Sequence, residues 1–359
     1  MIYARQAAFV PHAMLVFAVA TAANAAVGAE APPDRAGLCR RIDDALAHAR
    51  DRRRLDASVQ GAWQIVHGIL AFGPDFPLDA RGSTTTALDY LLAGGRATGW
   101  KLRTGSVGVT AEVDPGSTMG QGHPDQWLGY LSQCGVAAGG AGDPAGIPLD
   151  MPLRVGGRSF TVGDLLAQAQ HDIRPGQEAT WTLMALSHWL PPDAAWTAGD
   201  GEAWTTERVV SMEAQADVPS AACGGAHRLY GLAAAVSAYR RATGEDPEGS
   251  WAEAEAVLEH HLDRARRFQQ PDGSFAVRPF ERPGTSPDVF ARLGATGHAF
   301  EVLAVALDDA RLADPWVTRA ADRLVTLLES TSDLDVECGA LYHAAHGLAI
   351  YRDRICPPR

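Results

Sequence analysis

The sequence predicts an all-α protein, an α/α toroid of about six helical hairpins in which an outer ring of helices surrounds an inner ring. Three observations lead to this prediction. Apolar residues recur with helical periodicity along most of the chain. Capping signals open several segments, such as the capping box at 250–253 and the pair Asp314-Pro315. Helices with one charged face alternate with more apolar helices, at about 50 to 60 residues per pair.

The helices fall into two types that alternate along the chain. The outer ring is expected to contain the segments with one charged face, at about 36–54, 84–94, 161–172, 205–216, 250–268 and 315–330. The inner ring is expected to contain the segments rich in Ala and Gly with few charges, at about 60–72, 124–134, 178–190, 224–241, 295–308 and 338–352. A helix that is apolar nearly all round must be buried on most sides, which favours an inner position.

A helical solenoid is the alternative arrangement. Its terminal repeats would need polar caps, and the segment 338–352 is too apolar to serve as one. Short β excursions are expected at 100–113 and at 153–160, where Gly156-Gly157 suits a hairpin turn. No sequence signal marks a second domain, so we expect residues 30–359 to form a single toroid domain.

Composition and the N-terminal segment limit where the protein acts. The net charge of -12 argues against nucleic acid and anionic membranes as main partners, because both require a basic face. Residues 1–29 combine a positive charge, an apolar stretch and small residues that suit cleavage, as in a signal peptide; an uncleaved anchor is the alternative. We therefore expect an exported monomer, periplasmic or extracellular, without stable membrane insertion after cleavage.

Export permits disulfides, and five cysteines leave at least one thiol unpaired within the chain. Cys39 and Cys356 lie near the two ends of the mature chain, which a closed ring of helices would bring together. This pair is the expected disulfide, and two free thiols are the alternative.

Four segments share a small, Gly-rich lead-in, a histidine and an apolar helix: 122–127, 223–227, 294–298 and 338–346. In a ring, the starts of the inner helices gather round one centre. Helical spacing places Cys223, His227 and Tyr230 on one face, and His298 and Glu301 on another. The sequence therefore predicts a polar central cavity lined by His, Cys and Glu side chains, with His123 at the least informative of the four starts.

The first hypothesis for this cavity is a zinc site. Its ligands would be Cys223, His298 and Cys338, with His227, His343 or His346 completing the shell. Thiolate and imidazole are preferred zinc ligands, and an open fourth position would hold a water or a substrate. The alternative is structural: small residues allow close helix packing, and each histidine is satisfied by hydrogen bonds.

The second hypothesis is a carbohydrate-active enzyme, because six-hairpin barrels also carry glycoside hydrolases and polysaccharide lyases. An inverting hydrolase needs two carboxyl groups across a cleft, and the candidates are Asp125, Glu178, Glu301 and Glu337. Trp127 and Trp181 would stack on sugar rings, and a lyase would use His227 with Tyr230. Glu178 and Asp125 are equally suited to a first helical turn, where acidic groups complement the helix dipole.

Residues 269–275, Gln-Gln-Pro-Asp-Gly-Ser-Phe, resemble the Gln-rich, Gly-aromatic repeat of terpenoid cyclases and prenyltransferases. With the rhythm of its hairpins, the chain resembles an exported bacterial branch of this α/α toroid superfamily. The resemblance implies that Gln270 and Phe275 tie successive hairpins together. The Asp-x-Asp-Asp and Asp-Asp-x-x-Asp catalytic motifs are missing from the sequence. Protein prenyltransferases and lanthionine-cyclase-like toroids hold zinc through cysteine and histidine, to which Cys223, Cys338 and His343 or His346 look similar.

The working function is therefore an exported toroid that binds a small molecule, glycan or peptide in its central cavity, as a zinc-dependent enzyme of the prenyltransferase/terpenoid-cyclase-like fold. The catalytic candidates are Glu301, His298, Glu178, His227 and Tyr230. The alternatives are a carbohydrate-active enzyme on an (α/α)6 barrel and a non-catalytic extracytoplasmic scaffold.

Overall fold

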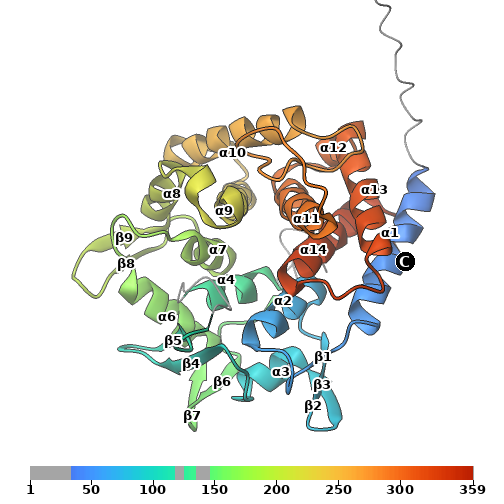
Figure 1. Cartoon of the computed structure of the whole chain (residues 1–359). Coiled ribbons are helices and arrows are strands. Elements are labelled where there is room, and N and C mark those ends of the chain that lie inside the picture. Colours follow the sequence, from blue (N-terminus) through green and yellow to red (C-terminus); the bar gives the residue numbers. More distant parts are fainter. Residues whose placement is uncertain (1–33, 118–124, 135–145, 359) are drawn as a thin grey trace, which may run out of the picture. The chain divides into compact units, whose positions relative to one another are not determined.

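Helices make up most of the chain, and the strands form small sheets at its edge, as a computed structural model shows for residues 34–117, 125–134 and 146–358 (Figure 1). The prediction of a mainly helical protein with small β excursions is confirmed. The leader at 1–29 and His123 lie outside the described residues, so export remains a prediction.

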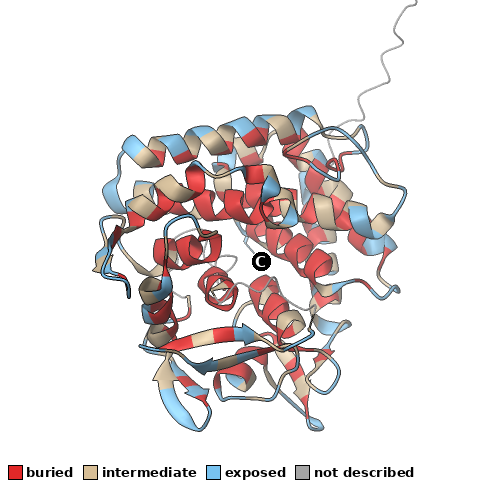
Figure 2. Ribbon diagram, turned by 60° about the vertical axis from the view of Figure 1, so that its left-hand side comes forward, coloured by how far each residue is buried: buried red, intermediate tan, exposed pale blue. Residues whose placement is uncertain are grey.

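The amphipathic helices lie where their charged faces predicted them, to within a few residues. They are α1 (Arg35–Asp51), α3 (Ala87–Leu92), α6 (Val162–Asp172), α8 (Thr206–Ala214), α10 (Gly249–Arg267) and α13 (Pro315–Ser330). In α10, Figure 2 shows a buried stripe beneath an exposed face, as the alternation of its apolar and charged residues requires.

The apolar helices are buried along most of their length (Figure 2). They are α2 (Ala62–Phe72), α4 (Gln126–Gln133), α7 (Thr180–Trp189), α9 (Ala226–Thr243), α11 (Val289–Ala306) and α14 (Cys338–Ile355). α11 is long and apolar enough to cross a membrane by length and composition, but 56% of it is buried within the protein, as in the core helix of a globular fold. Its composition is thus accounted for by its packing.

The predicted start of α11 at about residue 295 is wrong, because the helix begins at Val289. Asp288 caps it by accepting a hydrogen bond from the backbone N–H of Phe290. Gly294 and Gly297 therefore lie inside the helix, where they face α14. They serve close packing, and His298 lies near the middle of the helix.

The apolar helices contact one another in chain order. α2 packs against α4, α4 against α7, α7 against α9, α9 against α11, and α11 against α14, and α14 returns to α2. Each also packs against an amphipathic helix, for example α9 against α10 and α14 against α1. α12 (Asp309–Leu312) is a short turn of helix between α11 and α13.

Short antiparallel hairpins connect several of the helices (Figure 1). The two predicted hairpins are β4 (Trp100–Thr104) with β5 (Val109–Val113), and β6 (Pro152–Val155) with β7 (Arg158–Thr161). Two more hairpins were not predicted. The first is β2 (Pro77–Ala80) with β3 (Ser83–Thr86), and β1 (Leu55–Asp56) pairs with β2 in parallel. The second is β8 (Ala195–Thr197) with β9 (Ala203–Thr205). Strands of two to four residues are too short to show an alternating pattern.

The Gln-rich segment links two hairpins through Gln269, whereas the resemblance assigned this role to Gln270. The side-chain amide of Gln269 donates to the carbonyl oxygens of Trp316 (2.9 Å) and Gly273 (3.0 Å), and so ties the end of α10 to the start of α13. Gln270 bonds only locally, to the carbonyl oxygen of Phe268. Phe275 is buried edge-on against Trp316, in the structural role expected of it.

The predicted disulfide is confirmed: Cys39 on α1 is bonded to Cys356, which directly follows α14. The bond joins the first described helix to the last, across 317 residues of sequence. Cys134, Cys223 and Cys338 take no part in a disulfide.

Candidate metal centre

Cys223 lies in the tight turn that leads into α9. Two short 3-10 helices, η1 (Val218–Ser220) and η2 (Ala222–Gly225), precede the helix. Cys223, Gly224 and Gly225 have φ angles of 52°, 65° and 92°. This region suits glycine but costs another residue about 1–2 kcal/mol. The cysteine therefore holds a strained backbone, a feature that clusters at functional sites.

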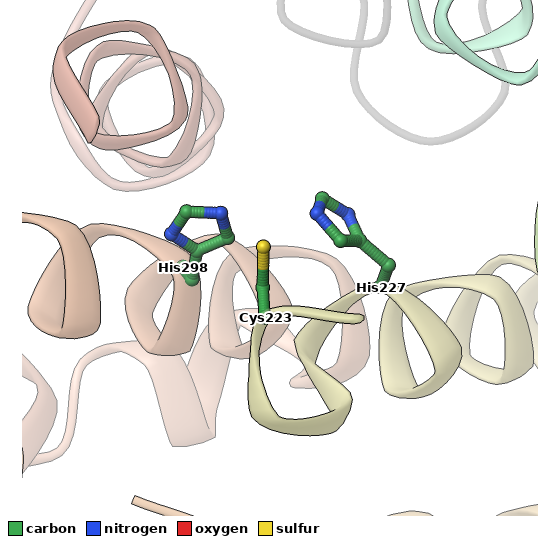
Figure 3. Close-up of side chains that lie close together, drawn as sticks. All are labelled: Cys223, His227 and His298. Carbon is green, nitrogen blue, oxygen red and sulfur yellow. The ribbon is translucent and has the colours of Figure 1, made fainter. Parts of the chain in front are cut away.

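The turn places the Cys223 thiol between two imidazole rings, those of His227 on α9 and His298 on α11 (Figure 3). One ligand atom from each of these residues lies within 4.8 Å of the other two. Cys223 is exposed, His298 is half-buried and His227 is buried. The three residues thus form a group of metal-ligand type in which the cysteine is exposed as a residue.

Hydrogen bonding fixes which nitrogen of His298 faces the thiol. Nδ1 of His298 lies 2.8 Å from the carbonyl oxygen of Gly294, one helical turn earlier. A carbonyl oxygen can only accept, so Nδ1 carries the proton and Nε2 keeps its lone pair when the ring is neutral. A carbonyl partner of this kind is the usual outer-shell arrangement of a histidine that ligates a metal.

Glycines bring α11 and α14 close together beside this group. A Cβ added at Gly297 would lie 3.0 Å from the backbone of Ala344, and one at Gly347 would lie 2.9 Å from the backbone of Glu301. Both distances are too short for an ordinary contact, so the two helices need glycine at these positions. The close approach sets Glu301 on α11 against the histidines of α14.

Glu301 is held by two histidines. Nδ1 of His343 donates to one carboxylate oxygen at 2.8 Å, and Nδ1 of His346 donates to the other at 2.6 Å. All three side chains are at most 2% exposed. The ring of His343 lies 4.2 Å from that of His298 and 5.0 Å from that of His227, measured between centroids. His343 therefore connects the carboxylate to the ligand group.

In the metal-free protein, the thiol and the imidazoles perturb one another. Desolvation raises the pKa of Cys223, but His227 and His298 outweigh it through charge and hydrogen bonds, and the pKa falls to about 4. Desolvation lowers the pKa of His298, but the thiolate and Glu301 outweigh it and raise that pKa to about 9. At neutral pH the metal-free centre thus holds a thiolate beside an imidazolium.

Next to the ligand group, the buried His343 ring is neutral and the buried Glu301 carboxyl group is ionised. Burial lowers the pKa of His343 to about 4, although Glu301 opposes the change, so this ring is neutral at pH 7. Burial raises the pKa of Glu301, but the hydrogen bonds and charges of His343 and His346 hold it well below its ordinary value. A general acid of a glycosidase needs a raised pKa, which Glu301 does not have.

A fifth histidine belongs to the cluster and was missed in the sequence. His67 on α2 is fully buried, and its Nδ1 donates to the carbonyl oxygen of Trp63 at 2.7 Å. Its ring lies 5.1 Å from that of His343 and 4.5 Å from that of Tyr130. His67 has no Gly-rich lead-in, and its only sequence signal is that of a histidine within an otherwise apolar helix.

The structure does not bring Cys338 into the ligand group. Within the described residues, Cys223, His227 and His298 are the only set of three or more metal-binding side chains that meet. Cys338 is the first residue of α14, and burial together with Glu337 and Asp335 raises its pKa to about 12. The prediction of Cys338 as a ligand is therefore not supported by its position.

The remaining candidates take other positions. His343 and His346 direct Nδ1 to Glu301 and stand behind the ligand group. Tyr230 is buried with its ring 6.3 Å from that of His346, and burial raises its pKa well above the ordinary value. These three residues lie around the ligand group and are not part of it. Any role they have in catalysis would be exerted through the ligands.

The carboxyl groups proposed for sugar chemistry have structural contacts. Glu337 caps α14 by accepting hydrogen bonds from the N–H groups of Gly339 and Ala340, both at 2.8 Å. Asp125 accepts a hydrogen bond from the Thr182 hydroxyl. Glu178 is half-buried, 3.4 Å from the hydroxyl of Thr180.

The tryptophans proposed to stack on sugar rings are fully buried. Trp127 packs edge-on against Trp100, and Trp181 packs against the rings of Tyr130 and His227. Other protein groups cover these two rings, so their contacts support a role in packing.

Comparison with known proteins gave no match: no family model, no curated protein and no solved structure is significantly similar to this chain.

Proposed function

We propose that the protein is an exported, zinc-dependent enzyme of the α/α toroid class, with Cys223, His227 and His298 as the metal ligands. The observation that carries the proposal is the meeting of these three ligand atoms within 4.8 Å of one another. They come from α11 and from α9 with the strained turn that leads into it, and these helices pack against each other.

The donor set fits zinc. One thiolate and two imidazoles are common zinc ligands, and bonds of about 2.0–2.3 Å separate ligand atoms by about 3.5 Å around a tetrahedral ion. The three atoms would therefore need only a small closing movement. With three protein ligands, zinc keeps a fourth position at which it polarises a substrate or lowers the pKa of a water. Cys223 is the exposed member of the group, so we expect a substrate to approach from its side.

The chain's own residues support such a centre from behind. The Gly294 carbonyl orients His298, and the Trp181 ring packs against His227, with centroids 4.6 Å apart. His343, oriented by Glu301, offers a neutral imidazole beside the ligands that could accept a proton from a bound substrate. Each of these orienting and proton-accepting roles is assigned from a contact between the residues named.

The toroid is proposed from the order of contacts. Six apolar helices contact one another in succession, and the contact between α14 and α2 completes the cycle. Amphipathic helices pack on the outside of this set, as α10 does on α9, and the disulfide joins the first and last helices. The cycle of contacts, the outer packing of the amphipathic helices and the disulfide all agree with an inner ring of helices surrounded by an outer ring.

Substitution of cobalt for zinc tests the ligand assignment. A thiolate bound to Co²⁺ gives a charge-transfer absorption in the near ultraviolet. We expect the Co²⁺-loaded protein to show this band and Cys223→Ser to lose it. Cys338→Ser is the matched control, because Cys338 is also outside the disulfide but lies apart from the ligand group. A band that survives in Cys223→Ser, or disappears in Cys338→Ser, would overturn the assignment.

A second candidate function uses the same side chains without a metal. The strained backbone of Cys223 at the start of α9 favours it, because nucleophilic residues often occupy such turns. The thiolate would attack an acyl carbon, the His298 imidazolium would give its proton to the leaving group, and water would then hydrolyse the thioester. Metal content separates the two functions, since only the first requires zinc.

A further inference from the structure

A buried ion pair lies behind the turn that carries Cys223. Arg228, on the first turn of α9, donates from Nε to a carboxylate oxygen of Glu213 on α8 at 2.9 Å. The arginine side chain is 6% exposed and the glutamate side chain 1%. Replacement of a buried ion pair by apolar residues is often neutral or stabilising. Stability is therefore a weak explanation for this pair, and its further contacts indicate what it does.

One further contact of the arginine reaches the Cys223 turn. Nη1 of Arg228 donates to the backbone carbonyl oxygen of Asp217 at 2.8 Å. Asp217 directly precedes η1, so the turn begins where the arginine holds it and ends at α9 itself. Near its end the turn packs closely against its own start, because a Cβ added at Gly225 would lie 2.4 Å from the carbonyl oxygen of Val218. Both ends of the turn are thus fixed to the start of α9.

A turn that is fixed in this way can keep a strained backbone. Cys223 has a φ of 52°, in the region that favours glycine. Such a conformation persists only where the surrounding contacts over-determine it. The Arg228 hydrogen bond and the close approach at Gly225 are contacts of this kind. Without them the backbone would be free to relax, and the thiol would move away from the two imidazole rings.

The glutamate of the pair contacts the helix that packs on His227. One oxygen of Glu213 accepts a hydrogen bond from the backbone N–H of Ala179 at 2.7 Å, and the other accepts one from the Thr180 hydroxyl at 2.8 Å. These contacts are at the start of α7, where the next residue is Trp181. Its ring lies 4.6 Å from that of His227, measured between centroids. The carboxylate therefore fixes the backbone that carries a ring packed on a ligand.

We infer that this buried ion pair positions the ligand group for the metal. Arg228 holds the turn of Cys223. Glu213 holds the start of α7, and with it the Trp181 ring that packs on His227. The inference rests on the proposed function, because metal binding is what the positioning serves. Ligands that are already held in place lose less freedom on binding, and so the metal binds more tightly.

The test compares two arginine-to-lysine substitutions in the full chain. Arg228→Lys keeps the charge beside Glu213, but an ammonium group lacks the fork that bonds this carboxylate and the Asp217 carbonyl together. Arg352→Lys is the matched control, because Arg352 is also largely buried, at 9% exposed, and its Nε bonds Asp43 on α1 at 2.9 Å. Zn²⁺ affinity is measured by competition with a coloured chelator, and stability by chemical denaturation.

The two variants should differ in metal binding. Arg228→Lys is expected to weaken Zn²⁺ binding by about tenfold, the lower end of the effect of losing an outer-shell partner. Arg352→Lys should leave the affinity unchanged, although both variants should be less stable than the wild type. In the Co²⁺-loaded protein, the thiolate band should shift or weaken in Arg228→Lys alone, because this band depends on the geometry at the sulfur. Lower stability without these two changes would overturn the inference.

Substitutions of Thr180 test the glutamate side, and they remain informative if Arg228→Lys does not fold. Thr180→Ser keeps the hydroxyl that donates to Glu213, so it should bind Zn²⁺ like the wild type. Thr180→Val keeps the shape but removes the donor, so its affinity should fall by about threefold or more. Equal affinities of these two variants would contradict the positioning role. A wild-type chain that binds no Zn²⁺ would instead contradict the proposed function, and the inference with it, so the wild-type titration distinguishes the two failures.

Discussion

Cys223 combines an unfavourable backbone with an unusual chemical environment. Its φ of 52° would suit glycine, yet the chain places a thiol there and surrounds it with His227 and His298. A simple turn into α9 could use a third glycine at lower cost, because Gly224 and Gly225 already follow it with positive φ. The cysteine side chain, and not the turn, is therefore what this position requires.

The ionisation of Cys223 gives a prediction at this scale. In the metal-free chain its pKa is about 4, so the thiolate fraction is nearly complete from pH 6 to pH 8. Alkylation of Cys223 by iodoacetamide, followed by mass spectrometry of its peptide, should then proceed at a rate almost independent of pH in this range. Cys338, with a pKa of about 12, should react far more slowly and about tenfold faster for each pH unit. A tenfold rise for Cys223 between pH 6 and pH 7 would show an ordinary thiol.

Which residues meet was predicted only in part from the sequence. Cys223 and His298 were predicted as ligands from the segments 223–227 and 294–298, with His227 as one of three residues that could complete the shell, and the structure brings these three together. Cys338 shared the same signals but lies elsewhere, because helical spacing fixes the direction of a side chain and not its depth. His67 has none of these signals, so its place beside His343 could come only from the packing of α2 on α14.

At the scale of elements, the contact between α11 and α14 decides the geometry of the centre. Gly297 and Gly347 let the two backbones approach, and that approach places Glu301 against His343 and His346. In the sequence, the glycines near His298 predict a lead-in to a helix, because Gly-rich segments often precede helices. Their true role depends on a helix distant in sequence, which local patterns do not reveal.

Alanine substitutions test this role of the glycines. Gly297→Ala should lower the free energy of unfolding by about 1–3 kcal/mol, because its Cβ would press on the backbone of Ala344 and force the helices apart. Gly294→Ala is the matched control on the same helix: its Cβ would meet Ala340 at an ordinary 3.6 Å, and alanine favours the helix by up to about 1 kcal/mol. Chemical denaturation of both variants checks the expectation. Equal effects from the two substitutions would contradict it.

At the scale of the whole molecule, the alternation of helix types was the most informative signal in the sequence. The ranges of the amphipathic helices and most of the apolar ones were predicted to within a few residues, since burial of a helix face leaves a direct trace in composition. The disulfide between Cys39 and Cys356 was also predicted, from the expectation that the ends meet. The extra hairpins left too short a pattern to detect.

The metal content of the purified chain tests most directly whether this fold carries a zinc centre. The protein should be produced with export, purified without chelators and analysed by inductively coupled plasma mass spectrometry. We predict close to one zinc ion per chain, because a site built from a thiolate and two imidazoles should be nearly filled. Less than about a tenth of an equivalent, with none regained on incubation with Zn²⁺, would contradict the zinc centre.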